Sequence, residues 1–200
     1  IDSGDRDRSW FHSKINPDLL LQDNDLIEVG NWSLQAVWTP GHTPGHLCVY
    51  IPDYDLLLTG DHVLGRITPN VSMSPDDEDI GRDPLTEFLD SLSKIKEYKT
   101  SVGLPAHEKL IPNLSERCSE LIQHHSNRCE EVMRGITDEK QASASKISSR
   151  VTWNKPFEGF SIFKKRMALG ETLAHLYYLE GRGKVTSHTD QETAITWSLT

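Results

Sequence analysis

The stretch Thr39-Pro40-Gly41-His42-Thr43-Pro44-Gly45-His46 joins two apolar segments and decides how we interpret the chain. Residues 34–38 before it and 47–51 after it have the Val, Ile and aromatic content of β-strands. The two Gly and two Pro residues between them favour a rigid, tightly turned loop. Such a loop at a strand end can hold an imidazole at a defined angle. The stretch therefore predicts a metal or catalytic site, provided that partner ligands lie further along the chain.

The bulk composition indicates an ordinary globular chain. Its 200 residues are enough for one domain with a core, or one domain with a small appendage. Hydrophobic residues make up 36% and charged residues 26% of the sequence. We expect no membrane association, because no apolar run approaches the length of a membrane span. Three Cys without a Cys-x-x-Cys spacing and no visible signal peptide predict a reducing, cytoplasmic location.

Charge is distributed unevenly along the chain. Residues 1–139 carry 12 Lys and Arg against 25 Asp and Glu, whereas residues 140–200 carry nine against five. The asymmetry suggests two units with different surfaces. We expect a catalytic unit over 1–137 and a winged-helix-like unit over 138–200, in which helices are followed by a two-stranded ribbon.

Two further polar residues share the context of His42. Asp61 lies in Leu-Thr-Gly-Asp-His (58–62), directly after a predicted strand, and His107 lies in Leu-Pro-Ala-His (104–107), after another. Each of the three has Gly or Pro beside it. Two imidazoles and one carboxylate from neighbouring strand ends are typical ligands of zinc, with iron or manganese as alternatives.

These three motifs, in this order, resemble those of the metallo-β-lactamase-fold hydrolase superfamily over roughly residues 25–135. The resemblance implies an α/β (α+β) fold, the C-terminal half of an αββα sandwich. The last sixty residues are similar to the winged-helix extension of a subgroup of β-lactamase-like proteins that includes an endoribonuclease.

The resemblance also implies roles for single residues. His42 corresponds to a ligand of the first metal, Asp61 to the catalytic carboxylate that bridges two metals, and His107 to a ligand of the second, with one or two Zn²⁺ ions as the cofactor. The family's His-x-His-x-Asp-His signature is absent from the sequence. The chain is therefore expected to need an N-terminal half of the same fold as a partner.

Other residues are candidates for supporting roles. His46 and His62 adjoin the ligand loops and could orient the ligands rather than bind metal themselves. Arg66 and Arg82 flank a long irregular loop and are candidates to bind an anionic substrate group, although loop arginines are more often simply solvated. Three aromatic residues either line a substrate channel or dock the C-terminal unit, which is the interpretation we favour: Trp153, Phe157 and Phe160.

The leading functional hypothesis is a metal-dependent hydrolase that uses a metal-activated water on an ester, thioester, lactone or similar small acyl substrate. The acidic balance of residues 1–139 argues against a polyanionic substrate. The alternatives are a metal-dependent endoribonuclease and a non-catalytic, partner-binding fragment. Nucleic acid and a second copy of the chain, as a homodimer, stay open as partners.

Overall fold

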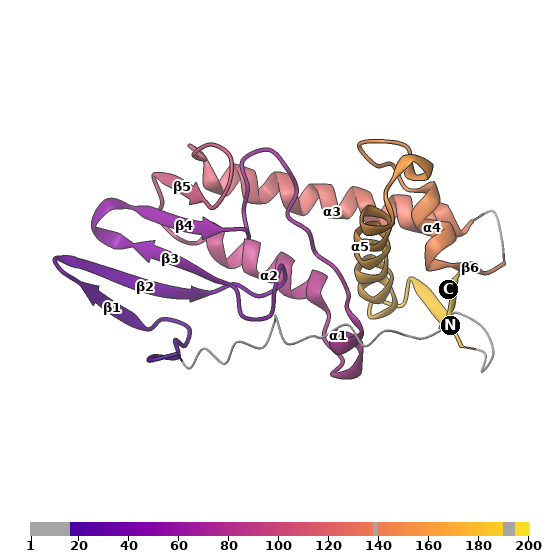
Figure 1. Ribbon diagram of the computed structural model, residues 1–200, viewed down its shortest axis with the longest axis horizontal. Coiled ribbons are helices and arrows are strands. Elements are labelled where there is room, and N and C mark those ends of the chain that lie inside the picture. Colours follow the sequence, from indigo (N-terminus) through magenta and orange to yellow (C-terminus); the bar gives the residue numbers. More distant parts are fainter. Residues whose placement is uncertain (1–16, 138–139, 190–194) are drawn as a thin grey trace, which may run out of the picture.

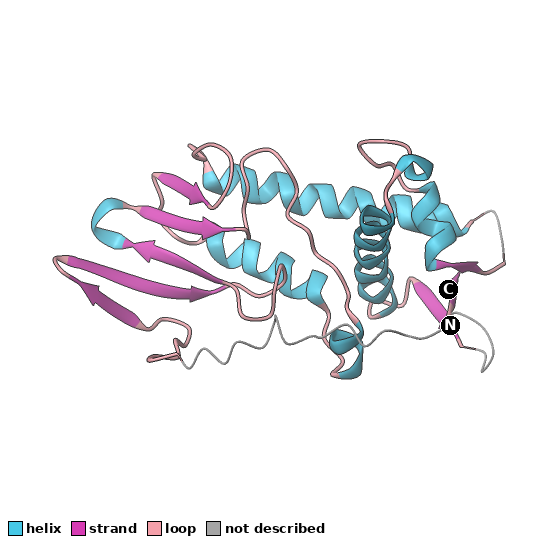
Figure 2. Ribbon diagram, viewed as in Figure 1, coloured by secondary structure: helices cyan, strands magenta, loops and turns pink. Residues whose placement is uncertain are grey.

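The computed structural model describes residues 17–137, 140–189 and 195–200. Figure 1 shows an elongated molecule with a sheet at one end and a group of helices at the other, and Figure 2 distinguishes the two kinds of element. The expected α/β (α+β) class is confirmed. Across the described ranges, the helices are too short or too polar to cross a lipid bilayer.

The main sheet has five strands in the order in which they follow along the chain. Strands β1 to β4 pair as antiparallel neighbours, and β5 adds to β4 in parallel. Their bounds are β1 Leu26–Val29, β2 Trp32–Trp38, β3 Leu47–Ile51, β4 Leu56–Gly60 and β5 Val102–Pro105. The 3-10 turn Pro52–Tyr54 joins β3 to β4. The strands that flank the opening loop therefore lie where the sequence predicts them.

Helices α2 (Pro84–Lys96) and α3 (Leu114–Ile136) cover one face of this sheet. Helix α2 begins directly after Asp83, whose side chain accepts a hydrogen bond from the backbone N–H of Thr86 and caps the helix. The core between sheet and helices consists of buried apolar side chains from both, among them Val37, Leu57, Phe88, Leu92 and Leu121.

The opposite face of the sheet is also apolar, although within the described chain no helix or second sheet packs across it. Because side chains alternate between faces along a strand, the register places a further set of apolar residues there. Val29, Trp32 and Leu58 of this set remain 54%, 43% and 38% exposed. The complete set is Ile27, Val29, Trp32, Leu34, Ala36, Trp38, Leu47, Val49, Ile51, Leu56, Leu58, Val102 and Leu104.

The loop after β4 runs past the helices to α1 (Pro75–Asp79). Two contacts with helices fix its course. The Arg117 side chain of α3 donates to the carbonyl oxygens of Leu64 (2.7 Å) and Ile67 (3.0 Å). The Met73 N–H donates to the carbonyl of Gly170 in the later helix α5 (Ile162–Glu180; 3.0 Å). The loop is therefore held against both helices.

The C-terminal part has its own sheet and core. Its elements are β6 Ala142–Ser143, α4 Ala144–Arg150, the 3-10 turn Phe157–Gly159, α5 Ile162–Glu180, β7 Val185–His188 and β8 Thr196–Leu199. Strand β8 lies between β6 and β7, and Trp197 of β8 is fully buried. The predicted two-stranded ribbon is present as β7 and β8. Strand β6 has only two residues, which are too few to form a recognisable pattern in the sequence. Residues 190–194 at the ribbon tip lie outside the described residues.

The proposed boundary at 137/138 falls directly after α3. That helix contributes to both cores, with Leu121 in the first and Val132 in the second. Helix α5 packs against both cores through Leu173 and Tyr177. The division into two domains and the winged-helix assignment stay predictions.

Candidate metal centre

Parallel pairing of β4 and β5 brings Asp61 and His107 together. Gly60 pairs with Pro105, and the N–H of Ala106 donates to the carbonyl of Gly60 (2.9 Å). The next residues of the two strands therefore share one edge of the sheet, where Nε2 of His107 lies 3.4 Å from Oδ1 of Asp61. That separation is longer than a normal hydrogen bond. His107 is largely exposed, and Asp61 Oδ1 is itself shielded from solvent.

His42 is oriented by a backbone group. Its Nδ1 atom lies 2.8 Å from the carbonyl oxygen of Asn70. A carbonyl oxygen can only accept, so Nδ1 carries the hydrogen and Nε2 keeps the lone pair. This is the arrangement by which proteins usually orient a metal-binding imidazole.

The position of the His42 loop depends on Gly41. Its φ of +129° is rarely adopted by residues with a side chain, and a Cβ atom there would lie 2.4 Å from Cα of Phe88. The loop thus rests directly on the backbone of α2, where the Ser91 hydroxyl also donates to the carbonyl of Pro40 (2.9 Å). Only glycine permits this close approach.

His46 belongs to a chain of buried hydrogen bonds. Its Nδ1 lies 2.8 Å from Oγ1 of Thr39, which donates to Sγ of Cys48 (3.4 Å), and Cys48 donates to the carbonyl of Thr59 (3.7 Å). Because the Thr39 hydroxyl donates its hydrogen to Cys48, its oxygen accepts a hydrogen bond from His46. Nδ1 of His46 therefore carries a hydrogen, and Nε2 has the lone pair. A Cβ atom on Gly60 would lie 2.6 Å from that Nε2, so a larger residue at position 60 would displace the ring.

His62 lies beneath this group and is fully buried. Its ring centroid is 5.4 Å from that of His46 and 4.5 Å from that of Phe88. Burial lowers the pKa of His62 to about 3, and the neighbouring His46 and His42 contribute to the lowering. Neither ring nitrogen has a hydrogen-bond partner among the described residues. His62 therefore supports the ring of His46 as a neutral, flat side chain.

The pKa of His46 is also lowered, first by burial and then by His42, against the opposite effect of Asp61. The rings of His42 and His46 meet edge to face with centroids 6.2 Å apart. Neutral imidazoles are the form that binds metal. His46 therefore adds a neutral ring next to His42.

These residues fit part of a zinc site. Imidazole nitrogen and carboxylate oxygen are donors that zinc accepts, and a buried carboxylate oxygen without a hydrogen bond suits a ligand role. Within residues 17–137, 140–189 and 195–200, however, no three His, Cys, Asp or Glu side chains converge closely enough to hold an ion by themselves. The donor chemistry agrees with the expected cofactor, and the remaining donors would have to come from outside the described residues.

The two candidate arginines have different surroundings. Arg82 binds the carboxylates of Asp77 and Glu87 and is 13% exposed, so its guanidinium is engaged within the corner between α1 and α2. Arg66 is exposed at the start of the long loop, where its backbone N–H donates to Oε2 of Glu108 (2.7 Å). Substrate binding by either arginine stays a prediction.

Two features of the site have no clear sequence signal. Asn70 acts through its backbone carbonyl, which any residue could supply. Thr39 and Cys48 support His46 through hydrogen bonds that depend on the pairing of β2 with β3. The opening motif contains Thr39, but its spacing alone does not predict this role.

Comparison with known proteins agrees with the strand-end motifs. The family model of the metallo-beta-lactamase superfamily matches residues 4–107. The curated "Lactamase-like protein nscB" of Arthroderma gypseum is 32% identical over 129 residues, which cover 63% of this chain and 38% of that protein. An "Atrochrysone carboxyl ACP thioesterase" of Aspergillus fumigatus is 29% identical over 126 residues, covering 62% and 36%.

Two solved structures resemble almost the whole chain. A metallo-beta-lactamase family protein of Thermus thermophilus has a TM-score of 0.76 at 29% identity and covers 92% of this chain and 55% of its own. A beta-lactamase domain protein of Burkholderia ambifaria has a TM-score of 0.81 at 28% identity and covers 90% and 52%. This chain thus matches about a third of the length of these curated relatives and about half of the length of these solved chains.

Proposed function

Because the chain belongs to the metallo-β-lactamase superfamily, we propose that it forms part of a metal-dependent hydrolase of acyl thioesters. The observation that carries the proposal is the meeting of Asp61 and His107 at the ends of two parallel strands, together with the Asn70 hydrogen bond that leaves Nε2 of His42 with its lone pair. A curated relative bears the name of a thioesterase, which favours a thioester over the ester and lactone alternatives.

The residues of this chain have separate tasks in the proposed site. Nε2 of His42, Nε2 of His107 and the carboxylate of Asp61 would hold the metal. Bound zinc lowers the pKa of a coordinated water to about 7 and polarises the scissile carbonyl. The Asn70 carbonyl keeps His42 in the tautomer that can bind. His46 and His62 pack behind the ligands and hold their loops in place.

The apolar outer face of the sheet supports an N-terminal half of the same fold as the partner. A sheet with one face on helices and a second apolar face is expected to bury that face against another layer. Val29, Trp32 and Leu58 are large apolar side chains that such a layer would cover. The chain also matches only about half of the solved relatives. The same N-terminal half would supply the missing metal donors.

A second copy of the chain is the competing occupant of that face. The two can be distinguished by measuring the mass of the full-length gene product and of the 200-residue chain under native conditions. If the full-length product is a monomer and the 200-residue chain forms dimers or aggregates, the result supports the N-terminal half as the partner that covers this face. A full-length dimer that dissociates when Leu58 is replaced by Lys supports the homodimer.

A ribonuclease activity is the second candidate. It is favoured by the consecutive basic residues Lys164, Lys165 and Arg166 at the start of α5. RNA cleavage would weaken steeply with added salt, because binding to phosphates releases counterions. A full-length, metal-loaded protein that neither binds nor cleaves RNA at low salt excludes this candidate.

The thioesterase proposal is tested with the full-length gene product after zinc loading. We expect it to hydrolyse acyl thioesters of coenzyme A or of N-acetylcysteamine, and to lose this activity in Asp61→Asn with the fold intact. His188→Ala provides a histidine control outside the site, since His188 contacts Ser198 in the C-terminal ribbon. Tightly bound metal without any thioester, ester or lactone hydrolysis would favour the non-catalytic alternative.

A further inference from the structure

A groove lies where the loop after β4 crosses α3 and α5. Its inner part is a cavity of about 540 Å³ whose walls include Thr68, Arg128 and Trp153. A second cavity of about 200 Å³ shares Trp153, Asn154 and Glu171 with the first and continues to Phe160 and Lys164. The two cavities therefore form one groove, which follows α5 from Glu171 to Lys164, a distance of about 10 Å at the rise of an α-helix.

The inner end of the groove lies close to the candidate metal centre. Thr68 is two residues before Asn70, whose carbonyl accepts the hydrogen bond from His42. Two residues of extended chain span at most about 7 Å. The same loop begins at Asp61, so one segment connects the groove wall to two of the candidate ligands. A long substrate with its reacting carbonyl at the metal centre could continue directly into the groove.

Arg128 forms a polar floor in the groove. Arg128 is 9% exposed, and its guanidinium lies 4.6 Å from the ring centroid of Trp153. Its Nη1 donates to the carbonyl of Thr152 (2.7 Å) and to Glu131 (3.0 Å). Its buried Nε lies 3.5 Å from Oε1 of Glu171 and makes no hydrogen bond among the described residues. The charge of the guanidinium is therefore balanced by Glu131 and Glu171 at the floor of the groove.

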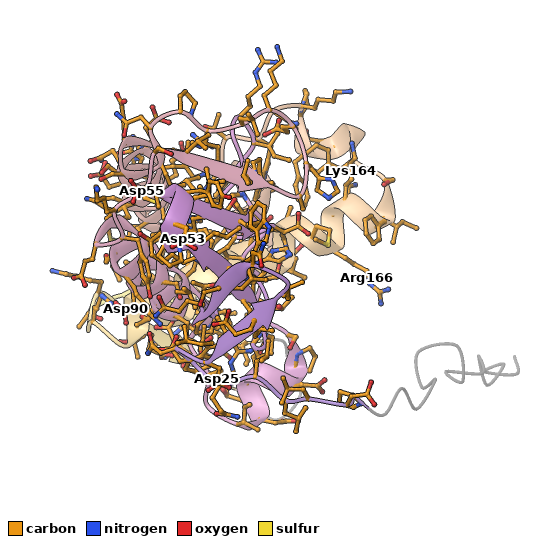
Figure 3. The ribbon with its side chains drawn as sticks, turned by 90° about the vertical axis from the view of Figure 1, so that its left-hand side faces the viewer. Asp25, Asp53, Asp55, Asp90, Lys164 and Arg166 are labelled. Atoms are coloured by element: carbon orange, nitrogen blue, oxygen red, sulfur yellow. The ribbon has the colours of Figure 1, made fainter. Side chains whose placement is uncertain are left out.

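The outer end of the groove is positively charged. Lys164 lines it, and Lys165 and Arg166 follow on the same helix, with no acidic residue between positions 159 and 170. In Figure 3, Lys164 and Arg166 lie toward the right of the molecule, and Asp53, Asp55 and Asp90 lie toward its left. An anionic group on the ligand would therefore be favoured at this end and disfavoured over the sheet.

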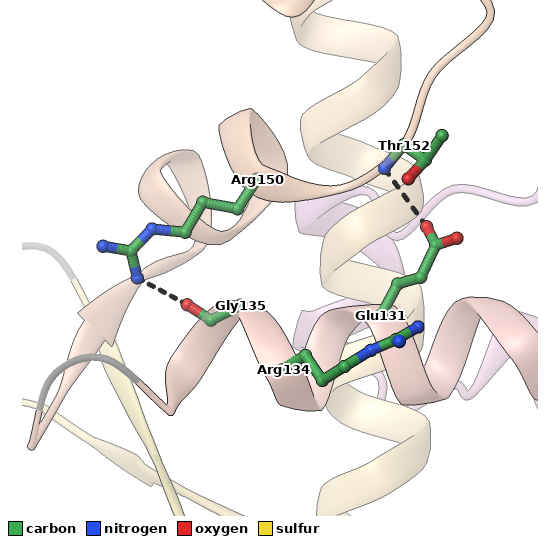
Figure 4. Close-up of a pocket in the computed structure, with 5 residues that line it drawn as sticks. All are labelled: Glu131, Arg134, Gly135, Arg150 and Thr152. Atoms are coloured by element: carbon green, nitrogen blue, oxygen red, sulfur yellow. Dashed lines mark hydrogen bonds between the residues drawn. The ribbon is translucent and has the colours of Figure 1, made fainter.

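A third cavity, of about 330 Å³, lacks these properties although two arginines line it. In Figure 4 the side chains of Arg134 and Arg150 point away from each other. Nη1 of Arg150 donates to the carbonyl of Gly135 (2.7 Å), and Glu131 accepts from the N–H of Thr152 (3.1 Å). The polar groups of this cavity thus do not converge on a ligand.

We propose that the groove binds the phosphopantetheine arm of the thioester substrate, with the phosphate at the basic start of α5. This rests on the proposed thioesterase function. The arm has amides that can hydrogen-bond to the exposed Asn154, and a dimethyl-bearing segment that suits Trp153 and Phe160. Its terminal phosphate matches the charge of Lys164. The thioester sulfur then lies at the inner end, beside the metal centre.

Calorimetric titration of the metal-free, full-length gene product with phosphopantetheine and with pantetheine tests the groove directly. We expect the phosphate to increase affinity by about tenfold, and Lys164→Glu to remove that gain. Asn154→Trp, at an exposed position, should fill the groove and weaken both ligands. Lys96→Glu on α2 makes the same charge change at an exposed lysine outside the groove and should alter neither. Equal binding of the two ligands, or equal effects of Lys164→Glu and Lys96→Glu, would overturn the proposal.

Kinetics separates this proposal from the proposed function. Lys164→Glu should raise the KM for a coenzyme A thioester and leave the KM for the N-acetylcysteamine thioester of the same acyl group unchanged. A rise in both KM values would mean that the groove holds the acyl chain, which would overturn the proposal and keep the thioesterase. If neither thioester is hydrolysed, the proposed function fails, and the titration still decides whether the groove binds the arm.

Discussion

Nε2 of His107 lies 3.4 Å from Oδ1 of Asp61, although the two residues come from separate sequence motifs. Parallel pairing of β4 with β5 produces this contact, because it aligns Gly60 with Pro105 and leaves the following residues at one sheet edge. Parallel strands place their carboxyl ends on the same side, where α/β proteins commonly bind ligands. The functional proposal depends on this one alignment.

Gly41→Ala should destabilise the protein. The new Cβ would overlap Cα of Phe88 at 2.4 Å, and the alanine would have to adopt a φ of +129°. We expect a loss on the order of 3 kcal/mol in the free energy of unfolding, measured by urea denaturation. Gly45→Ala in the same loop is the matched control, since nothing lies within 4 Å of its Cβ position. Equal stability of the two variants would show that the loop does not rest on α2 as described.

Arg82→Gln should affect stability more than substrate affinity. The substitution leaves the carboxylates of Asp77 and Glu87 without their partly buried partner, and we expect a cost of about 2 kcal/mol. Arg66→Gln changes an exposed residue and should leave stability unaltered. Thermal unfolding and steady-state kinetics on both variants separate the two roles. An increase in KM for Arg82→Gln at unchanged stability would instead support substrate binding.

Stability should fall as the pH drops below about 6.5. Nδ1 of His125 lies 3.1 Å from Nε2 of His175 between α3 and α5. Burial lowers the pKa of His175 to about 4 and that of His125 well below its usual value. The unfolded chain therefore binds protons near pH 6.5 that the folded chain does not. His175 should cost on the order of 2 kcal/mol at pH 5, and His125 acts in the same direction.

The charged neighbours of this pair require a variant as a control. Arg128 and His124 help to lower the pKa of His125, because their positive charges disfavour its protonation. Burial raises the pKa of Glu171, so that protonation of Glu171 stabilises the folded state at low pH and opposes the effect of the histidines. His175→Gln should therefore reduce the loss of stability between about pH 8 and about pH 5, measured by urea denaturation. An unchanged difference in the variant would mean that other groups dominate the pH dependence.

The sequence predicts the ligand-bearing strand ends because Gly and Pro mark where each strand stops. The start of α2 also has a local signal, since Asp83 followed by Pro84 is a typical N-cap and first-turn pair. The sequence does not predict that the Asn70 carbonyl orients His42, because that bond depends on the course of the long loop and not on the residue type. The ion pairs of Arg82 with Asp77 and Glu87 likewise depend on how α1 and α2 are arranged in space, which the sequence does not predict.

The central claim is that His42, Asp61 and His107 bind metal, and the metal content of full-length variants tests it most directly. Zinc per protein should be measured by mass spectrometry after dialysis for His42→Ala, Asp61→Ala and His107→Ala, with His188→Ala as the control and circular dichroism to confirm folding. We predict a lower zinc content in all three site variants and an unchanged content in His188→Ala. Zinc content equal to that of the wild type in all three site variants would contradict the account.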